Sequence, residues 1–224
     1  MIIEITGASG SGKTTLLKKI SNTFPELIIV TDTDDIKEKS KWLEVLNFIK
    51  WGLYFIFSCP MYWKYFISLF SYMKFMEDTL FNKLNMLRNS IKKISIYVFY
   101  KRKYADSLVI IDEGISHVPY NLITTASSRS IPIEKIYSGF KDLITDTSLL
   151  ILDVPLSVIV ERLLKRGHNR INIKNIERFA EENNRITKEI KIIGKKYFNK
   201  IFLIDEKSSV REIVKNIIEY KKHI

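Results

Sequence analysis

Hydrophobic residues along this chain gather into five short runs, separated by longer stretches with a helical pattern. The runs occupy residues 2–6, 27–31, 108–111, 149–152 and 201–204. Short runs of consecutive apolar residues are typical of strands buried on both faces, and helical stretches between them favour a parallel sheet with helices on either side. The pattern therefore predicts an α/β fold in which ligands bind at the carboxyl ends of the strands.

Helical patterns follow the first strand and close the chain. The first helix is expected over residues 13–21, directly after the first apolar run. The last helix begins with Ser209 and Glu212, which have the spacing of a capping box. Its apolar stripe at i, i+4 spacing consists of Ile213, Val214, Ile217 and Ile218.

Residues 36–104 interrupt this alternation with a stretch rich in aromatic side chains. We interpret it as a helical insertion between the second and third strands, in which most aromatics form a core between helices and the whole frames an acceptor pocket. A membrane span is the sharpest alternative. However, the apolar run from Trp51 contains Pro60 and stops at Lys64, whereas a span needs roughly twenty uninterrupted apolar residues. An interfacial or re-entrant helix remains the open alternative.

Composition limits the class of protein. With 224 residues, 46% of them hydrophobic, the chain is long enough for one α/β domain and short for two. The one cysteine, Cys59, excludes an internal disulfide framework, and the chain starts without a signal-peptide pattern, which favours a reducing cytoplasm. The net charge of +11 favours nucleotide phosphates, nucleic acid or an anionic membrane surface as partners, or is simply a solvated lysine-rich surface.

The most specific motif directly follows the first apolar run and matches G-x-x-x-x-G-K-[ST]. The residues that would surround the phosphates of a nucleotide are Gly7, Ala8, Ser9, Gly10, Ser11, Gly12, Lys13, Thr14 and Thr15. Glycines let such a loop curl until its backbone N–H groups point at the phosphates. Lys13 then reaches the β- and γ-phosphates, Thr14 places its hydroxyl on Mg²⁺, and the helix directs its positive end at the anion. The motif predicts a nucleoside triphosphate site.

Acidic residues end two of the other predicted strands. Asp112 is expected to hold Mg²⁺, directly or through water, as the second half of a P-loop site. Glu113 either polarises an attacking group or caps the helix after Gly114. Asp32 and Asp34 end the second strand, where they bind and deprotonate a hydroxyl acceptor or instead cap the helix that begins near residue 36.

Three arginines follow the fourth strand. Arg162 and Arg166 are four residues apart and share one helix face, and Gly167 ends that helix and places Arg170 on a loop. Permanently charged, planar guanidinium groups suit the charge that spreads over a migrating phosphoryl group. We therefore interpret residues at about 166–174 as a lid. The alternative is an ordinary basic helix with an Arg–Glu surface pair through Glu161.

Taken together, these motifs resemble the P-loop nucleoside monophosphate kinase superfamily, and within it most closely the thymidylate kinases. The shared features are the P-loop, Asp112, the run L-D-V-P…E-R-L-x-x-R-G…R and the closing I-D-E…S-S-V-R-E-I-V pair, in residues 1–35 and about 105–224. The resemblance implies a three-layer sandwich around a five-stranded parallel sheet of order 2-3-1-4-5, with ATP and Mg²⁺ as cofactors and a closing lid. It also implies P-loop roles for Lys13, Thr14 and Thr15, and lid roles for the three arginines.

This chain departs from the thymidylate kinase pattern after the third strand. Those kinases typically have Asp-Arg and an aromatic residue there, whereas this chain has the sequence D-E-G-I-S-H at residues 112–117. The acceptor-binding arginine of the family is therefore missing from its place. The cluster at residues 31–35 is more similar to the acceptor site of small-molecule hydroxyl kinases, such as adenylylsulfate and gluconate kinases.

The sequence thus favours a single P-loop kinase-like domain over residues 1–224 that transfers the γ-phosphoryl group of ATP to a nucleotide or another small hydroxyl or phosphate acceptor. Lys13, Asp112 and the lid arginines are the expected catalytic groups. Two alternatives stay open: a polynucleotide-directed kinase or nucleic-acid-stimulated ATPase, and a membrane-surface NTPase switch that docks through residues 42–75.

Overall fold

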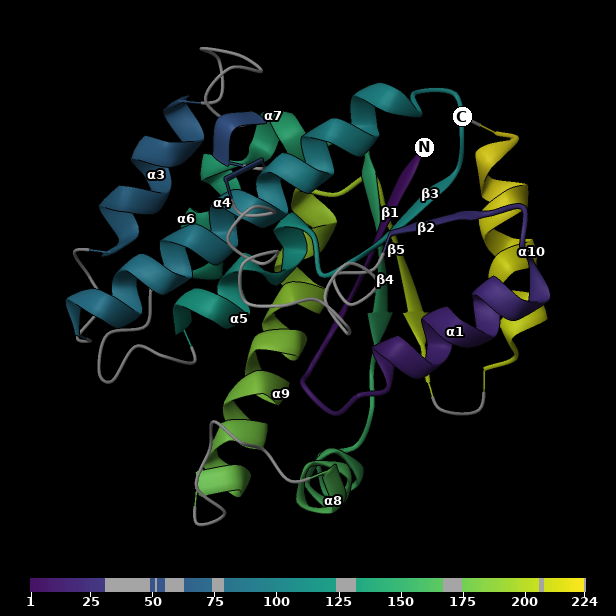
Figure 1. Ribbon diagram of the computed structural model, residues 1–224. Helices are drawn as coiled ribbons and strands as arrows, with labels where there is room; N and C mark the ends of the chain where they lie inside the picture. The colour runs from purple at the N-terminus through teal and green to yellow at the C-terminus, as the bar shows by residue number, and fades with distance from the viewer. Residues whose placement is uncertain are drawn as a thin grey trace.

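A computed structural model gives the structure of most of the chain (Figure 1). The residues that it describes are 1–30, 49–50, 52–54, 63–73, 79–123, 132–166, 175–205 and 208–223. Five strands form one sheet in the order β2-β3-β1-β4-β5, and every neighbouring pair is parallel. The strands are β1 (Ile2–Gly7), β2 (Ile28–Val30), β3 (Val109–Asp112), β4 (Thr147–Leu152) and β5 (Lys200–Ile204). This arrangement confirms the fold and the strand order expected from the sequence.

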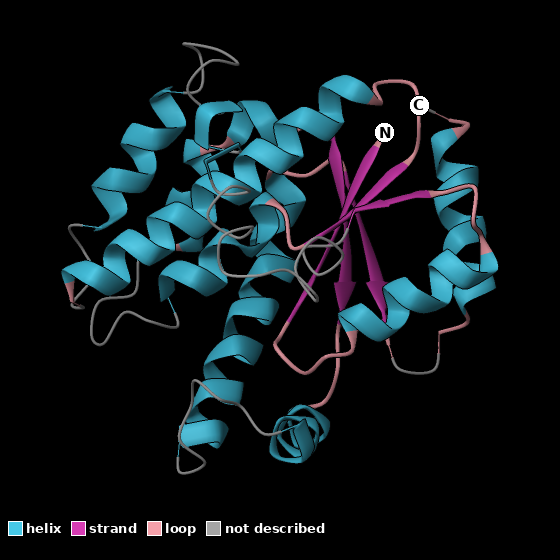
Figure 2. Ribbon diagram, in the orientation of Figure 1, coloured by secondary structure: helices cyan, strands magenta, loops and turns pink. Residues whose placement is uncertain are grey.

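Helices cover both faces of the sheet and make a three-layer sandwich (Figures 1 and 2). On one face lie α1 (Lys13–Thr23) and α10 (Val210–Lys221). On the other gather α4 (Leu80–Lys103), α5 (Val118–Ile123), α6 (Ile133–Gly139) and α9 (Ile176–Ile193), with α3 (Trp63–Met73) farther out. The remaining elements are α7 (Lys141–Ile144), α8 (Leu156–Arg166) and the 3-10 helices η2 (Ile115–His117) and η4 (Gly194–Lys196).

Strand β1 is the centre of the sheet, and all six of its residues are buried. Because successive side chains of a strand point to opposite faces, Ile3 and Ile5 join the apolar cluster under α1 and α10, while Ile2 joins the cluster under α4 and α9. Glu4 and Thr6 share the face of Ile2, and both are fully buried. The central strand therefore has one apolar face and one face with polar groups.

Parallel pairing brings the ends of three strands together beside the P-loop. Ile5 of β1 pairs with Asp112, the last residue of β3, and Gly7 pairs with Leu152, the last residue of β4. The loop that follows Gly7 therefore starts next to the carboxyl ends of β3 and β4. This is the edge at which open parallel sheets bind ligands.

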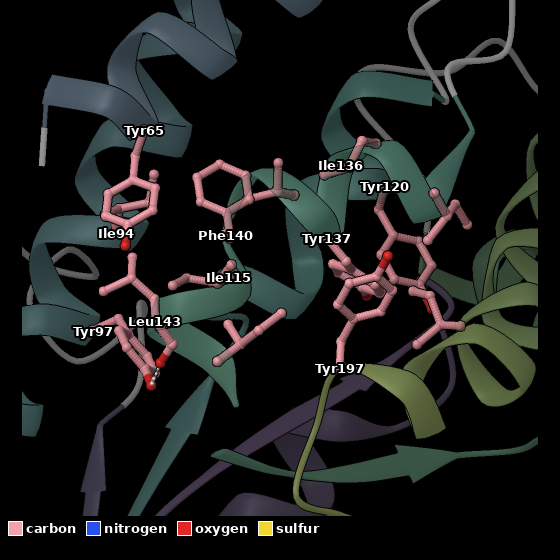
Figure 3. Packing of buried hydrophobic residues seen from close by; sticks show 14 of the residues in the cluster. Tyr65, Ile94, Tyr97, Ile115, Tyr120, Ile136, Tyr137, Phe140, Leu143 and Tyr197 are labelled. Atoms are coloured by element: carbon pink, nitrogen blue, oxygen red, sulfur yellow. Dashed lines mark hydrogen bonds between the residues drawn. The ribbon is translucent and has the colours of Figure 1, made fainter. Parts of the chain in front are cut away.

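The aromatic insertion contributes part of the larger core. Tyr65 of α3 is buried and stacks on Phe140, and the buried Tyr97 hydroxyl donates a hydrogen bond to the Leu143 carbonyl at 2.7 Å (Figure 3). Trp63 and Phe70 are about half exposed, at 49% and 51%. A role in the core is thus correct for the first two aromatics and wrong for Trp63 and Phe70.

Two expectations about helices are also answered. Within the parts of the chain that the structure describes, no helix is both long enough and apolar enough to cross a membrane. The last helix begins after Ser209 as expected, but the Ser209 side chain makes no capping hydrogen bond, so the capping box is wrong in its chemistry. Of the expected stripe, Ile213, Val214 and Ile217 are buried.

Candidate active site

The P-loop has the backbone that its glycines predict. Gly10 and Gly12 have φ angles of 85° and 100°, in the left-handed region that residues with a side chain rarely adopt. A Cβ atom at Gly7 would lie 3.0 Å from the Leu152 carbonyl oxygen, so the end of β1 needs glycine for packing against β4. Helix α1 starts at Lys13, and Gly12 at its N-cap has no side chain to occupy the first-turn N–H groups. These groups are left for an anion.

Lys13 lies folded over this loop. Its Nζ donates hydrogen bonds to the carbonyl oxygens of Gly7 at 2.9 Å and Ala8 at 3.2 Å, and the residue is only 7% exposed. The Ser11 hydroxyl inside the loop is buried and has no hydrogen-bond partner among the described residues. In this loop the lysine bonds to uncharged carbonyl oxygens, and the buried Ser11 hydroxyl has no partner among the described residues. Both features fit a phosphate chain, which would supply acceptors to both groups.

Asp112 supplies the carboxylate of the site. Asp112 is the last residue of β3 and is 8% exposed. In the parallel pairing of β1 and β3 it lies opposite Ile5, two residues before the P-loop begins. Thr14 is exposed in the first turn of α1. A carboxylate and a hydroxyl are oxygen donors of the kind that Mg²⁺ takes together with phosphate oxygens and water. The described residues contain no group of three or more His, Cys, Asp and Glu side chains that would hold a metal by themselves.

Glu113 lies at the centre of a charged cluster, which we call the Glu113 cluster and which contains Glu113, Lys13, Lys93 and His117. Glu113 Oε2 accepts a hydrogen bond from Lys93 Nζ of α4 at 2.9 Å, and Oε1 lies 3.5 Å from Lys13 Nζ. His117 Nε2 is 3.6 Å from Oε2. The backbone of Glu113 has a φ of 54°, in the left-handed region, which is uncommon outside glycine and is typical of functional loops. The cluster joins the P-loop to α4 through one carboxylate.

Glu113 and His117 both have pKa values well below their ordinary values, for different physical reasons. Burial alone would raise the pKa of the Glu113 carboxyl, but the positive charges of His117 when protonated, Lys93 and Lys13 outweigh it and hold that pKa well below 4.5. Burial lowers the pKa of His117 well below 6.5, against the pull of Glu113. At neutral pH the cluster therefore holds an ionised Glu113 and a neutral His117.

Glu4 of β1 fixes the segment that follows Glu113. Its two carboxylate oxygens accept the backbone N–H groups of Ile115 at 2.9 Å and Ser116 at 2.6 Å. A Cβ atom at Gly114 would overlap the Glu4 carboxylate, so a larger residue there would displace this hydrogen-bonded group. Burial raises the pKa of Glu4, partly offset by these hydrogen bonds. Glu4 thus takes the N–H groups that Glu113 was expected to cap under one of its two interpretations, and the Glu113 carboxylate is directed to the lysines instead.

A tyrosine extends the buried polar region beyond the Glu113 cluster. The Tyr120 ring stacks on His117 with the ring centroids 4.6 Å apart, and its hydroxyl shares a hydrogen bond of 2.8 Å with Thr187 of α9. Figure 3 shows Tyr120 beside Tyr137, whose hydroxyl donates to the Ser116 carbonyl at 3.1 Å. Elements α5, α6 and α9 are thereby tied to the segment that carries Glu113.

The expected lid arginines differ in what the structure shows of them. Arg162 Nη1 donates a hydrogen bond to the Ser11 carbonyl at 3.1 Å, so α8 contacts the P-loop. Arg166 is exposed at the last residue of α8. The acidic partner on this helix, Glu161, pairs with Lys165 at 3.0 Å. Arg170 lies outside the described residues, as do Asp32 and Asp34.

Sequence reasoning missed Glu4, Lys93 and Tyr120. Glu4 had a usable signal, because a charge inside an apolar strand is buried and must find partners. Lys93 is one of several lysines on a long helix, and nothing in its local pattern marks it. Tyr120 likewise gains its place only from the turn of η2 and α5.

The strand order and the P-loop together define the fold. The protein has a parallel sheet of order 2-3-1-4-5 with a P-loop between the central strand and the first helix, which is the P-loop kinase fold.

Solved structures with this fold cover nearly the whole chain. A deoxyadenosine kinase from M. mycoides with the products dCMP and dCDP bound has a TM-score of 0.56 and 17% identity, with both chains covered completely. The same kinase with dATP bound has a TM-score of 0.51 and 18% identity over 99% of this chain and 100% of that one. A thymidylate kinase from Candida albicans has a TM-score of 0.53 and 13% identity over 99% and 91% of the two chains. At these identities the likeness shows the fold.

Sequence comparison adds one curated relative. The cytochrome c biogenesis ATP-binding export protein CcmA of Reclinomonas americana is 29% identical over 193 residues, which cover 76% of this chain and 73% of that protein. No family model matches the chain.

Proposed function

We propose that this protein is an ATP-dependent kinase that transfers the γ-phosphoryl group to a small acceptor of the nucleoside or nucleotide kind. The observation that carries the proposal is that the P-loop, which Lys13 contacts at Gly7, and the strand end that carries Asp112 lie at the same carboxyl edge of a sheet with the kinase strand order. The names of the structural neighbours, deoxyadenosine kinase and thymidylate kinase, support a nucleoside or nucleotide acceptor. The name of the curated relative supports ATP binding.

In this proposal the P-loop binds the triphosphate. Lys13 exchanges the Gly7 and Ala8 carbonyls for phosphate oxygens, and the first-turn N–H groups of α1 face the anion. Thr14 and Asp112 hold Mg²⁺, which when bound neutralises the phosphate charge.

The lid arginines act in the transition state of the proposed reaction. Arg162 already contacts the loop at Ser11, and we assign Arg166 and Arg170 to closure over the γ-phosphate. Planar guanidinium groups stabilise the spread charge of a migrating phosphoryl group.

The acceptor side consists of Glu113 together with Asp32 and Asp34 at the end of the second strand. If either aspartate binds the acceptor, Asp32→Asn or Asp34→Asn lowers the turnover with the melting temperature unchanged. If it only caps a helix, asparagine replaces it with little change in either quantity. Steady-state kinetics and thermal melting on the same preparations separate the two roles.

The two other functions considered for the sequence gain no specific observation. A nucleic-acid-directed kinase or ATPase rests on the net charge of +11 alone. A membrane-surface switch rests on the aromatic insertion, in whose described parts Tyr65 and Tyr97 are buried in the core while Phe81 is 73% exposed.

Radiolabelled ATP offered with a panel of nucleosides, nucleotides, sugars and polyols tests the proposed function. Transfer of the γ-label to a small acceptor is expected, and the same reaction with Lys13→Ala is the control for contaminating kinases. Release of labelled phosphate with no labelled acceptor in the presence of any compound would identify an ATPase and contradict the proposal.

A further inference from the structure

We infer that the group which accepts the phosphoryl is an uncharged hydroxyl rather than a phosphate monoester, and that Glu113 is the residue that makes this choice. The inference rests on the proposed kinase function and narrows its acceptor class. It starts from the order in which the groups of the Glu113 cluster face the solvent.

Glu113 is the most exposed side chain of this cluster. Glu113 exposes 29% of its side chain, whereas Lys13, Lys93 and His117 expose 8%, 9% and 12%. A ligand that reaches the cluster from solvent therefore meets the Glu113 side chain before it meets the side chain of either lysine. Kinases that accept a phosphate monoester need the opposite arrangement, with cations facing the acceptor.

Both lysines are already engaged by this carboxylate. Lys93 Nζ donates to Glu113 Oε2 at 2.9 Å, and Lys13 lies 3.5 Å from Oε1 while it bonds to the loop carbonyls. Within the Glu113 cluster no cation is left over for a phosphate on the acceptor. A phosphate monoester placed here would meet both the carboxylate and the γ-phosphate, and such juxtaposition of like charges strongly disfavours binding.

The carboxylate also lies where an attacking hydroxyl needs an acceptor for its proton. Lys13 is the residue that follows the β- and γ-phosphates in P-loop sites, so an oxygen 3.5 Å from its Nζ is close to the γ-phosphate position. The bond from Lys93 and the left-handed backbone at residue 113 hold the carboxylate in this place. Glu113 is thus pre-oriented to accept a hydrogen bond from an acceptor hydroxyl.

A lone pair on the hydroxyl oxygen attacks the γ-phosphorus, and the bond from that phosphorus to the bridging oxygen breaks with its electron pair left on ADP. The hydroxyl proton passes to Glu113 and later to solvent. A phosphate acceptor brings its own ionised oxygen and needs no such group, so the carboxylate would serve no purpose for it.

Matched pairs of acceptors test the inference on the wild-type protein. Each nucleoside or polyol is compared with the compound that carries a phosphate on the hydroxyl to be attacked, for example thymidine with thymidine 5′-monophosphate, and kcat/KM is measured with radiolabelled ATP. We expect the hydroxyl member of the productive pair to be preferred by a factor on the order of 10². Preference for the phosphorylated member overturns the inference but leaves the kinase proposal standing. Transfer to no acceptor overturns both.

The variant Glu113→Gln keeps the shape of the side chain and removes its charge. With the best hydroxyl acceptor we expect kcat to fall by a factor on the order of 10², while binding of a non-hydrolysable ATP analogue persists and shows that the protein is folded. The hydroxyl preference should also shrink, a change that a purely structural role of Glu113 would not produce. The matched control is Glu219→Gln, which removes an exposed carboxylate paired with Lys215 on α10.

Full turnover of a folded Glu113→Gln protein on hydroxyl acceptors would overturn the role given to Glu113. If the variant fails to bind the ATP analogue because it is unfolded, the acceptor pairs measured on the wild-type protein still decide the acceptor class.

Discussion

The two faces of strand β1 differ in chemistry, although alternate residues of one six-residue strand form both of them. The face toward α1 and α10 carries Ile3 and Ile5, both fully buried in an apolar cluster. The opposite face carries Glu4 and Thr6, also fully buried, next to the segment that holds Glu113. The apolar face supports the fold through hydrophobic burial, whereas the polar face organises the loop that supplies the charged side of the site. Burial alone therefore does not distinguish structural from functional positions in this strand.

Lys13 is the first residue of α1 and contacts the end of β1 through the Gly7 carbonyl, and its removal should have the largest effect. Lys13→Ala is expected to lower turnover by a factor on the order of 10²–10³, because it deletes a preorganised charge on the migrating phosphoryl group. The matched control Lys18→Ala, an exposed lysine of the same helix, should leave the rate unchanged. Steady-state kinetics on both variants check this prediction. Wild-type turnover by Lys13→Ala would contradict the P-loop assignment.

The buried carboxylate on the polar face of β1 should contribute to stability as strongly as the buried isoleucines on its apolar face. Glu4→Ala leaves the N–H groups of Ile115 and Ser116 buried without an acceptor, which is expected to cost about 2–4 kcal/mol in the free energy of unfolding. Glu4→Gln should cost less, because the amide oxygen still accepts one of the two hydrogen bonds. Urea denaturation measures these changes.

Gly114 and Glu26 provide the companion variants for this prediction. Gly114→Ala should destabilise the protein because its Cβ overlaps the Glu4 carboxylate. Glu26→Ala, at an exposed position, is the control for loss of a carboxylate. A Glu4→Ala protein as stable as this control would show that the two N–H groups find other partners.

The expected lid arginines should matter less than Lys13 and in a different kinetic parameter. Arg162→Ala and Arg170→Ala are expected to lower kcat about tenfold with little change in ATP affinity, because their targets gain charge mainly in the transition state. Arg178→Ala, an exposed arginine of α9, serves as the control. Weaker ATP binding at an unchanged kcat would instead make the two arginines ground-state contacts.

The smallest expected effect is a pH dependence of stability that belongs to the polar face. The folded pKa of His117 lies well below the unfolded value of 6.5, so its contribution to stability is present above pH 6.5 and is lost as the pH falls toward the folded pKa. The groups around it are Glu113, Lys93, Lys13 and the stacked ring of Tyr120. Between about pH 6.5 and 5.5 we expect a loss of about 1 kcal/mol.

A comparison with His117→Gln isolates the contribution of His117 to the pH dependence of stability, because glutamine does not titrate. Glu4 is present in both proteins and changes their stability in the opposite sense, since its raised folded pKa gives a contribution that is present below its unfolded pKa and is lost as the pH rises through the folded value. Because only the wild type loses the His117 contribution, the free energies of unfolding of wild type and variant should converge as the pH falls over this range. Parallel curves would show that His117 is protonated equally in both states.

Much of the fold was predictable from apolar runs alone. The five strands were expected within about one or two residues of their observed ends, because strands such as β1, β3 and β4 that are buried on both faces need consecutive apolar residues. The edge strands β2 and β5 share the apolar pattern but are only partly buried. The exposure of Trp63 and Phe70 on α3 was not predictable, because an aromatic residue in a helix has no local mark of whether another helix will cover it.

The residues of the site also differ in how far the sequence alone could predict them. The P-loop and Asp112 were visible in the sequence, since the loop is one continuous segment whose glycines are required by its backbone and the carboxylate directly follows a strand. Glu113 was recognised, but two roles were open for it. The capping role is wrong, because Glu4, which lies 111 residues from Ile115 in the chain, takes the N–H groups of that turn.

The sequence by itself determined that this protein has a P-loop on a parallel sheet, because periodicity and local backbone demands act over a few neighbouring residues. Only the tertiary structure decided which charges meet at Glu113. Lys13, Lys93 and His117 come from α1, α4 and η2, and their distances to one carboxylate are set by how these helices pack on the sheet. Packing of distant segments is a property of the whole fold, and it is this packing that places a negative charge in front of the P-loop lysine.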